Sequence, residues 1–405
     1  MVVSGRPGAS KHLTFIAPGE GRGPTRAFCP QLPVDKWQSR CVTLPVPVRS
    51  KEAIVLRAFK TALGAWAAAA LLAMAPSSVL AQRLALTTER AIDAAMQASV
   101  DGGWAPGGAV AVMLGGKVVF SRGYGMANLE TRTPVSADSV FRVGSLTKQF
   151  TAVAVLLLAQ DRKLSLDDPA NKYLPQVPAN DPTTIRQLLN HTAGIADYVT
   201  GPDFGQIKWL PLTPEQLVAH IMALKPVHNF APGTDWAYSS SNYALAGAIV
   251  EKVSGEPLRD FLAERLFGPL GMTHTALDDD RAVAPGRASG YDLLAGRAGF
   301  VNAATVSMST AFAAGALRSS VGDLLIWSHA LTHGDVLRPE YYRQMVTPAH
   351  LNDGTRPMAF TDRQGKTYSN DYALGIVASG DPAHPELTHG GAIDGFTSSL
   401  TIFTG

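Results

Sequence analysis

The sequence predicts an α/β protein of the α+β type, with an antiparallel sheet flanked by helices and a helical region inserted into it. Strand-like runs occur soon after residue 100 and again after residue 370, and helical patterns fill the interval between them. Strands at both ends of a chain with helices between them indicate one sheet closed by the two termini. The first two runs are separated by Gly115-Gly116, which is typical of a two-residue hairpin.

Each element is predicted from its own pattern. Ile92, Ala95 and Met96 recur on one face of a helix over 88–99. The hairpin strands, 108–114 and 117–124, are rich in valine. The alanine and leucine content of 149–159 is that of a buried helix. Further helices are expected over 213–223, 242–253, 321–332 and 339–346, and further strands over 372–378, 386–389 and 397–403.

The charge of the chain is divided unevenly. Of the 405 residues, 46% are hydrophobic and 17% are charged, and the formal net charge is +2. Residues 1–81 contain ten Lys or Arg and three Asp or Glu, whereas the rest contains 25 basic and 30 acidic residues. The globular part is therefore acidic, and no nucleic-acid partner is predicted. Both cysteines, Cys29 and Cys41, precede residue 82, which excludes a cysteine nucleophile from the body.

Residues 55–81 have the pattern of an export signal, with a membrane anchor as the alternative. Arg57 and Lys60 precede an apolar run over 61–75, shorter than the ~20 residues of a membrane span. Val79 and Ala81 suit a cleavage site before residue 82. We therefore expect a disordered extension over 1–54, a signal peptide over 55–81 and a periplasmic or secreted domain over 82–405.

The segment Gly144-Ser-Leu-Thr-Lys148 brings a candidate nucleophile close to a candidate base. On a helix, Ser145 and Lys148 are neighbours on one face. Ser145 would also lie at the helix N-terminus, where free N–H groups and the dipole stabilise negative charge, an arrangement that suits acyl transfer. A Ser-x-x-Lys spacing arises by chance in most chains of this length, so a capping serine beside a solvated lysine is the alternative interpretation.

Several segments occur together in a recognisable order. Among them are Leu188-Leu-Asn-His-Thr-Ala-Gly, Pro232-Gly-Thr-Asp-Trp-Ala-Tyr238 and His389-Gly390-Gly391, together with 141–150, 164–175, 268–275 and 314–324. This set resembles the serine beta-lactamase-related family of class C beta-lactamases, low-molecular-weight DD-peptidases and related esterases. The resemblance covers roughly residues 88–405. It implies the beta-lactamase/transpeptidase-like form of the fold.

The resemblance implies roles by position. Ser145 matches the family nucleophile and Lys148 its partner. Tyr238 matches the tyrosine of the Tyr-x-Asn motif, and His389 opens the strand motif that is Lys-Thr-Gly in many beta-lactamases. Because burial or nearby charge shifts a pKa, Lys148 and Tyr238 are both candidates for the base, and the sequence does not decide which takes the proton. His389 is expected to donate to the substrate or relay a proton. The substrate-binding and oxyanion set is Ser145, Ala392, Gly390, Gly391 and Ser240.

Two departures from the family pattern bear on function. Ser240 stands where the family has the Asn of Tyr-x-Asn, so we expect weaker recognition of beta-lactam or peptide amides than of simple esters. The chain also stops at Gly405, where the family continues with a strand and a long helix. That strand pairs between the N-terminal hairpin and the strand after His-x-Gly. With strand and helix missing, we expect unpaired edges and an exposed apolar face around Val110, Val112 and Val119.

The sequence therefore predicts an exported serine hydrolase that forms an acyl-enzyme on Ser145. Its substrates would be small esters, D-amino-acid peptides or beta-lactams, with a cell-wall peptide among the candidate partners. No organic cofactor is implied. No metal is implied either, because His329 and His333 lack the Glu of zinc-protease spacing. The alternatives are a non-catalytic cell-wall peptide binder or sensor, which Ser240 favours, and an inactive fragment of the same fold.

Overall fold

The computed structural model describes residues 11–17, 84–294, 299–361, 367–381 and 384–404. The strands are β1 (Lys11–Ala17), β2 (Gly107–Leu114), β3 (Lys117–Asn128), β4 (Thr133–Pro134), β5 (Phe141–Arg142), β6 (Ala276–Leu277), β7 (Tyr291–Leu293), β8 (Phe300–Asn302), β9 (Leu317–Ser319), β10 (Met358–Thr361), β11 (Thr367–Ser369), β12 (Val377–Asp381), β13 (His384–Ile393) and β14 (Phe396–Phe403). The helices are α2 (Leu86–Asp101), α3 (Thr147–Gln160), α4 (Ile185–Leu189), α5 (Phe204–Ile207), α6 (Pro214–Met222), α7 (Ser240–Ser254), α8 (Leu258–Leu262), α9 (Gly268–Leu270), α10 (Met308–Gly315), α11 (Val321–His333) and α12 (Pro339–Val346). Short turns of helix are η1 (Gly144–Leu146), η2 (Ala170–Lys172), η3 (Tyr198–Thr200) and η4 (Ala263–Phe267).

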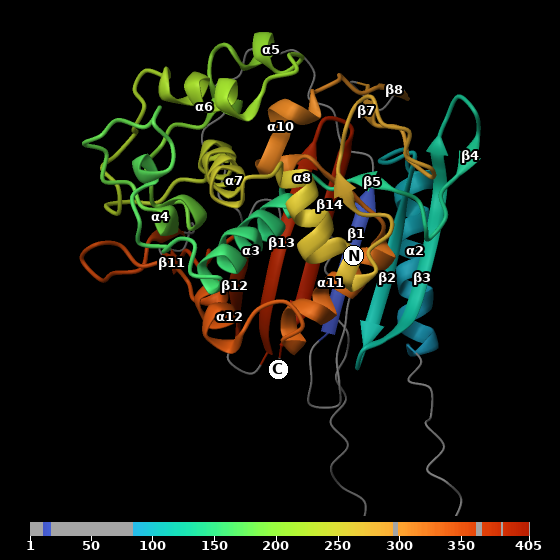
Figure 1. Cartoon of the computed structure of the whole chain (residues 1–405). Helices are drawn as coiled ribbons and strands as arrows, with labels where there is room; N and C mark the ends of the chain where they lie inside the picture. Colours follow the sequence, from blue (N-terminus) through green and yellow to red (C-terminus); the bar gives the residue numbers. More distant parts are fainter. Residues whose placement is uncertain (1–10, 18–83, 295–298, 362–366, 382–383, 405) are drawn as a thin grey trace, which may run out of the picture.

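A seven-stranded antiparallel sheet lies at the centre, in the order β12-β13-β14-β1-β2-β3-β4. The hairpin β2–β3 precedes the helical region in the chain and β12, β13 and β14 follow it, so the helical region is inserted as the sequence predicts (Figure 1). The predicted fold class is confirmed. Gly115 and Gly116 turn the hairpin with φ of 56° and 75°, values that glycine adopts without strain.

Strand β1 corrects the expectation for the N-terminal extension. Residues 11–17 lie inside the span 1–54 that we expected to be disordered, yet they pair with both β14 and β2. The prediction is wrong for these residues, because a strand that joins two open edges satisfies backbone N–H and C=O groups on both sides. The other residues of 1–54 and the expected signal peptide over 55–81 lie outside the described residues.

The expected unpaired edges and exposed apolar face are also wrong. Strand β1 occupies the place between β14 and β2 that we expected to stay empty. Val110 and Val112 are buried, and Val119 is half-buried. Helix α11 contacts β1 and β2, and α2 contacts β3, at the right of the sheet in Figure 1. The sheet is therefore covered where we expected apolar exposure.

Helix α3 is the buried axis of the molecule. Every residue from Thr147 to Ala159 is buried, which agrees with the predicted core helix. Phe150 packs on Trp327 of α11 with ring centroids 4.2 Å apart, and Gln149 accepts a hydrogen bond from the same indole at 3.1 Å. Helices α7 and α10 contact α3 from the inserted region. The N-terminus of α3 is thereby fixed between the sheet and the helical region.

One predicted strand is placed differently. We expected a strand over 372–378, but β12 begins only at Val377. Gly375 has a φ of 75°, which turns the chain, and Tyr372 to Ile376 form a buried loop instead. The apolar residues in this segment reflect burial against the body of the protein.

Candidate active site

The candidate nucleophile and base lie together at the N-terminal end of α3. Ser145 is in the turn η1, and the Lys148 Nζ atom donates hydrogen bonds to Ser145 Oγ at 3.2 Å and to the Ala314 carbonyl at 2.8 Å. Lys148 is fully buried, whereas Ser145 is partly exposed. Burial lowers the pKa of Lys148 to about 7, and the nearby Asp197 carboxylate acts in the opposite direction. A fraction of the amine is therefore neutral at neutral pH.

Two tyrosines enclose the Lys148 amine. The Nζ atom lies 4.8 Å from the ring centre of Tyr238 and 5.5 Å from that of Tyr243. Burial raises the pKa of Tyr238, although its hydrogen bond with Ser145 lowers it in part. The Tyr238 phenol is therefore neutral at neutral pH and lies within hydrogen-bonding reach of the nucleophile.

The turn η1 packs closely against β13, where we expected the oxyanion donors. Gly144 has a φ of 51°, and a Cβ atom there would lie 2.8 Å from the backbone nitrogen of Ala392. A Cβ on Gly391 would lie 2.0 Å from the Val143 carbonyl oxygen. These glycines allow the backbone at Ser145 to approach Ala392. The backbone N–H of Ser145 and that of Ala392 are the two candidate oxyanion donors.

Among the described residues, β12 accompanies only the first half of β13. Pairing between β12 and β13 ends at Val377 and Thr388. Within the described residues, the part of β13 from His389 onward has no strand partner on that side. An extended substrate can therefore pair with this edge through its own backbone. Gly390 is exposed on the strand, and a Cβ atom there would have room.

His389, which we expected to donate to the substrate or relay a proton, contacts two groups of the protein through its ring nitrogen atoms. Its Nδ1 atom lies 2.6 Å from the Gly390 carbonyl oxygen, and its Nε2 atom lies 3.0 Å from the Tyr372 hydroxyl. Burial and the Lys148 charge lower the pKa of His389 to about 4. The ring is therefore neutral, and both of its nitrogen atoms have partners inside the protein.

Ser240 begins α7 at the rim of the site. Its backbone N–H donates to Asp197 Oδ1 at 3.0 Å. Asn242 is fully buried, and its Nδ2 atom lies 3.1 Å from Nδ1 of His191. Asn242 therefore cannot replace the amide that Ser240 lacks. His191 also accepts from the Ser239 N–H, which agrees with a structural role for this histidine.

Asp197 and Tyr372 are site residues that sequence reasoning missed. Asp197 caps η3 and accepts from Ser240, 43 positions along the chain. The sequence predicts Tyr372 at the start of a strand, yet its hydroxyl lies 3.0 Å from Nε2 of His389. The only signal for Asp197 was a carboxylate just after the His-Thr-Ala-Gly segment. For Tyr372 the sequence held no signal.

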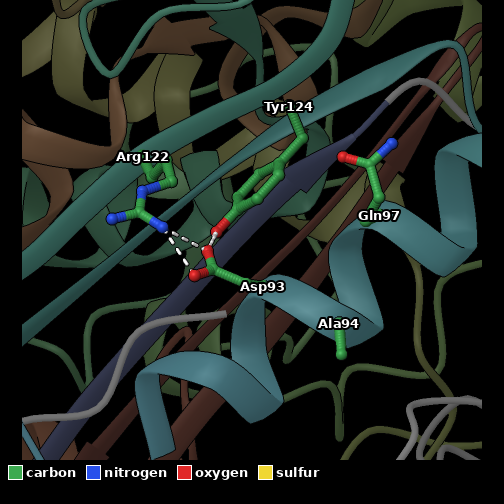
Figure 2. A pocket seen from close by; sticks show the side chains of 5 residues that line it. All are labelled: Asp93, Ala94, Gln97, Arg122 and Tyr124. Carbon is green, nitrogen blue, oxygen red and sulfur yellow. Dashed lines mark hydrogen bonds and ion pairs between the residues drawn. The ribbon is translucent and has the colours of Figure 1, made fainter. Parts of the chain in front are cut away.

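The described residues also contain a hollow without a nucleophile and base pair. It measures about 500 Å³ and lies between α2 and β3, lined by Asp93, Ala94, Gln97, Arg122 and Tyr124. Figure 2 shows that Asp93 accepts from Arg122 and Tyr124 there, at 2.6 and 2.5 Å. Asp93, Arg122 and Tyr124 are hydrogen-bonded to one another, so these side chains join α2 to β3 and have a structural role.

The described residues contain neither a metal-binding cluster nor a membrane-spanning helix. In that part of the chain, no cluster of three or more His, Cys, Asp or Glu side chains could hold a metal ion. None of the helices in the same part is both long and apolar enough to cross a bilayer.

The family model for beta-lactamases matches residues 92–405. The chain belongs to the beta-lactamase family. Protein flp of Staphylococcus aureus (strain NCTC 8325 / PS 47) is 27% identical over 325 residues, which cover 79% of this chain and 61% of that protein. The putative penicillin-binding protein PbpX of Bacillus subtilis (strain 168) is 30% identical over 263 residues, covering 65% of this chain and 63% of that protein. The chain thus spans about three fifths of the length of the curated relatives it matches.

Solved structures agree with this assignment. A D-stereospecific amidohydrolase from Streptomyces sp. superposes with a TM-score of 0.62 at 30% identity, covering 78% of this chain and 94% of that one. A D-amino acid amidase from Ochrobactrum anthropi SV3 has a TM-score of 0.64 at 24% identity, covering 78% and 91%. The second likeness supports the fold alone. The family and its fold are therefore established by sequence and by structure.

Proposed function

We propose that this chain is a serine hydrolase that forms an acyl-enzyme through Ser145 with a small ester or amide. The observation that carries the proposal is the buried Lys148 amine, 3.2 Å from Ser145 Oγ, with a pKa lowered to about 7. A buried amine that loses its proton near neutral pH is a competent general base. The sequence left open whether Lys148 or Tyr238 is the base. Because burial raises the pKa of Tyr238, we assign the first proton transfer to Lys148.

The reaction follows from this geometry. Neutral Lys148 takes the proton of Ser145 as Oγ attacks the substrate carbonyl carbon, and the N–H groups of Ser145 and Ala392 stabilise the oxyanion. The bond to the leaving amine or alcohol breaks as that group receives the proton, with Tyr238 as the relay to it. Water then attacks the acyl carbon and gives a proton to neutral Lys148, which passes it to Ser145 Oγ as the ester bond breaks, so that the acid leaves and both residues return to their starting state.

The substrate class is part of the proposal. Small esters, D-amino-acid amides or peptides and beta-lactams remain candidates, and the D-stereospecific amidohydrolase at 30% identity supports the D-amino-acid amides. Residue Ser240 favours esters over efficient beta-lactam turnover, since it offers no amide donor. We also propose export through residues 55–81, to the periplasm or the medium, which N-terminal sequencing of the mature protein would test.

Intact-mass spectrometry with a fluorophosphonate and with a penicillin tests the proposed nucleophile. We expect one adduct on Ser145 with the fluorophosphonate, and none in a Ser145→Ala variant. An adduct from penicillin that is released with time indicates a hydrolase, whereas one that persists indicates a cell-wall peptide sensor. No adduct with either reagent would contradict the proposal.

Replacing Ser240 with Asn tests the role of that position. The amide restores a donor that can reach a substrate carbonyl, and we expect turnover of an amide or beta-lactam substrate to rise about tenfold relative to that of an ester, the effect of one recovered hydrogen bond. Steady-state kinetics on matched ester and amide substrates gives the ratio. A Ser240→Ala variant is the control, and an unchanged ratio in Ser240→Asn would rule out this role.

A further inference from the structure

Tyr372 lies in the loop before β12 and contacts His389 of β13. The Tyr372 hydroxyl is 3.0 Å from Nε2 of His389, and both side chains are buried. The Nδ1 atom on the other side of the ring is 2.6 Å from the Gly390 carbonyl oxygen. Tyr372 takes no part in the proposed acyl-transfer steps.

These two contacts define the state of the imidazole. A carbonyl oxygen only accepts hydrogen bonds, so the Gly390 contact places the proton of His389 on Nδ1. The Nε2 atom of a neutral ring is then an acceptor, and the Tyr372 hydroxyl is its donor. The ring consequently has no free N–H to offer to an incoming anion.

The position of the Tyr372 hydroxyl is itself fixed. Its backbone N–H donates to the Asn370 side chain at 2.9 Å, and its carbonyl accepts from Ala349 at 2.9 Å. Its ring packs 4.7 Å from the ring of His191 and 6.0 Å from that of Tyr238. A hydroxyl held in this way keeps its partner ring in one orientation and one tautomer.

Lys148 and Lys208 also have partners inside the protein. Lys148 donates to Ser145 and to Ala314. Lys208, which reaches the turn after β13, forms an ion pair with Asp394 at 3.0 Å. A substrate carboxylate beside His389 would therefore meet no N–H group of that ring, and burying the carboxylate unpaired is costly.

We propose that Tyr372 is a positioning and specificity-determining residue, which holds His389 as the neutral Nδ1–H tautomer and so directs the site to substrates whose leaving group is uncharged. These are esters and amides without a carboxylate on the leaving group. The inference rests on the proposed function, because it concerns the substrates of the same acyl transfer. The Tyr372 hydroxyl acts through His389 and does not touch the reacting atoms.

A matched pair of thioesters tests the selectivity. N-acetyl-D-alanyl thioesters of thioglycolamide and of thioglycolic acid share the scissile bond and differ only in the leaving-group carboxylate. For the wild-type protein we expect kcat/KM for the amide form to exceed that for the acid form by at least about tenfold, the size of one missing charge-assisted hydrogen bond. Equal rates for the two thioesters would overturn the inference while leaving the nucleophile intact.

Tyr372→Phe removes only the hydroxyl. With Nε2 released, the ring can carry its proton there and donate to a carboxylate, so we expect the preference for the amide form to shrink several-fold. Tyr341→Phe is the matched control, because it also deletes one phenol hydroxyl, which donates to the Ala159 carbonyl and not to His389. A preference unchanged in Tyr372→Phe would contradict the assignment.

Nitrogen-15 NMR of histidine-labelled protein provides a readout that needs no turnover. We expect His389, assigned with a His389→Gln variant, to be the Nδ1–H tautomer in the wild type and to lose that bias in Tyr372→Phe. An Nε2–H tautomer in the wild type would overturn the inference even if Tyr372→Phe folds poorly. If neither thioester reacts and Ser145 stays unmodified, the proposed function fails, whereas the tautomer still decides the role of Tyr372.

Discussion

The protonation of Lys148 depends on a residue outside the Ser-x-x-Lys motif. Burial lowers the pKa of Lys148 to about 7, and Asp197 opposes this shift. A base works only when it is neutral, so kcat/KM should rise with pH through about 7. Asp197→Asn removes the charge that stabilises the ammonium while keeping an acceptor for the Ser240 N–H. We therefore expect the acid limb of the pH–rate profile to move to lower pH.

Steady-state kinetics across the pH range checks this shift. Asp203→Asn is a suitable control, because Asp203 lies on the same segment but pairs with His220 at 3.6 Å. If both variants keep the wild-type acid limb, Asp197 does not govern the Lys148 amine and another residue limits the profile.

The sequence could predict residues that lie within a short motif, and it missed residues whose partners are distant. Ser145 and Lys148 are three positions apart on one helical turn, so their contact follows from helix geometry. Asp197 and Tyr372 contact the site only after the chain has folded. Their role is set by packing, which leaves no local pattern in the sequence.

At the scale of elements, the contact between η1 and β13 depends on one of the two glycines after His389. In Gly391→Ala the new Cβ would lie 2.0 Å from the Val143 carbonyl oxygen, so the strand and the nucleophile turn must separate. We expect a loss of about 2–4 kcal/mol in the free energy of unfolding, measured by chemical denaturation. Gly390→Ala is the matched comparison, because its Cβ meets only the Ser398 carbonyl at 3.9 Å. Equal stability of the two variants would contradict this account.

A buried carboxylate joins the small strands that support the nucleophile. Asp278 follows β6, its side chain is fully buried, and it forms ion pairs with Arg142, Arg287 and Arg318. Asp278→Ala would leave three partly buried guanidinium groups without that partner, and we expect the free energy of unfolding to fall by about 3 kcal/mol. Asp279→Ala is the control, since its ion pair with Arg259 is more exposed. Thermal and urea unfolding should separate the two variants clearly.

The difference between predicted and observed elements has a physical origin. Helix α12 was predicted with its observed ends, 339–346, because a proline begins it and its apolar face is periodic. The 372–378 segment was misassigned, because apolar residues in a buried loop resemble those of a buried strand. Periodicity reports burial and local geometry, and it does not report which backbone groups are paired.

At the scale of the whole molecule, the sheet depends on a segment far from the rest of the domain in sequence. No local pattern indicates that 11–17 joins the sheet, since seven residues carry little periodicity and their partners, β2 and β14, are about 100 and 390 residues away. The need for a strand at this position could be inferred from the family pattern. Which segment would supply it could not.

Deleting residues 1–20 tests the contribution of β1, whose register aligns six residue pairs with β14 and six with β2. We expect the free energy of unfolding to fall by roughly 3–6 kcal/mol, because both strands lose their backbone partners, and the two open edges to promote self-association. Urea unfolding and light scattering measure the two effects. Deletion of 1–10 is the control, since it leaves β1 intact, and Thr14→Pro should reproduce the loss by removing one strand donor. A truncated protein that is monomeric and as stable as the full chain would show that β1 is dispensable. The proposed cleavage before Gln82 would also remove β1, so the expected loss of stability in the truncated protein would count against that cleavage.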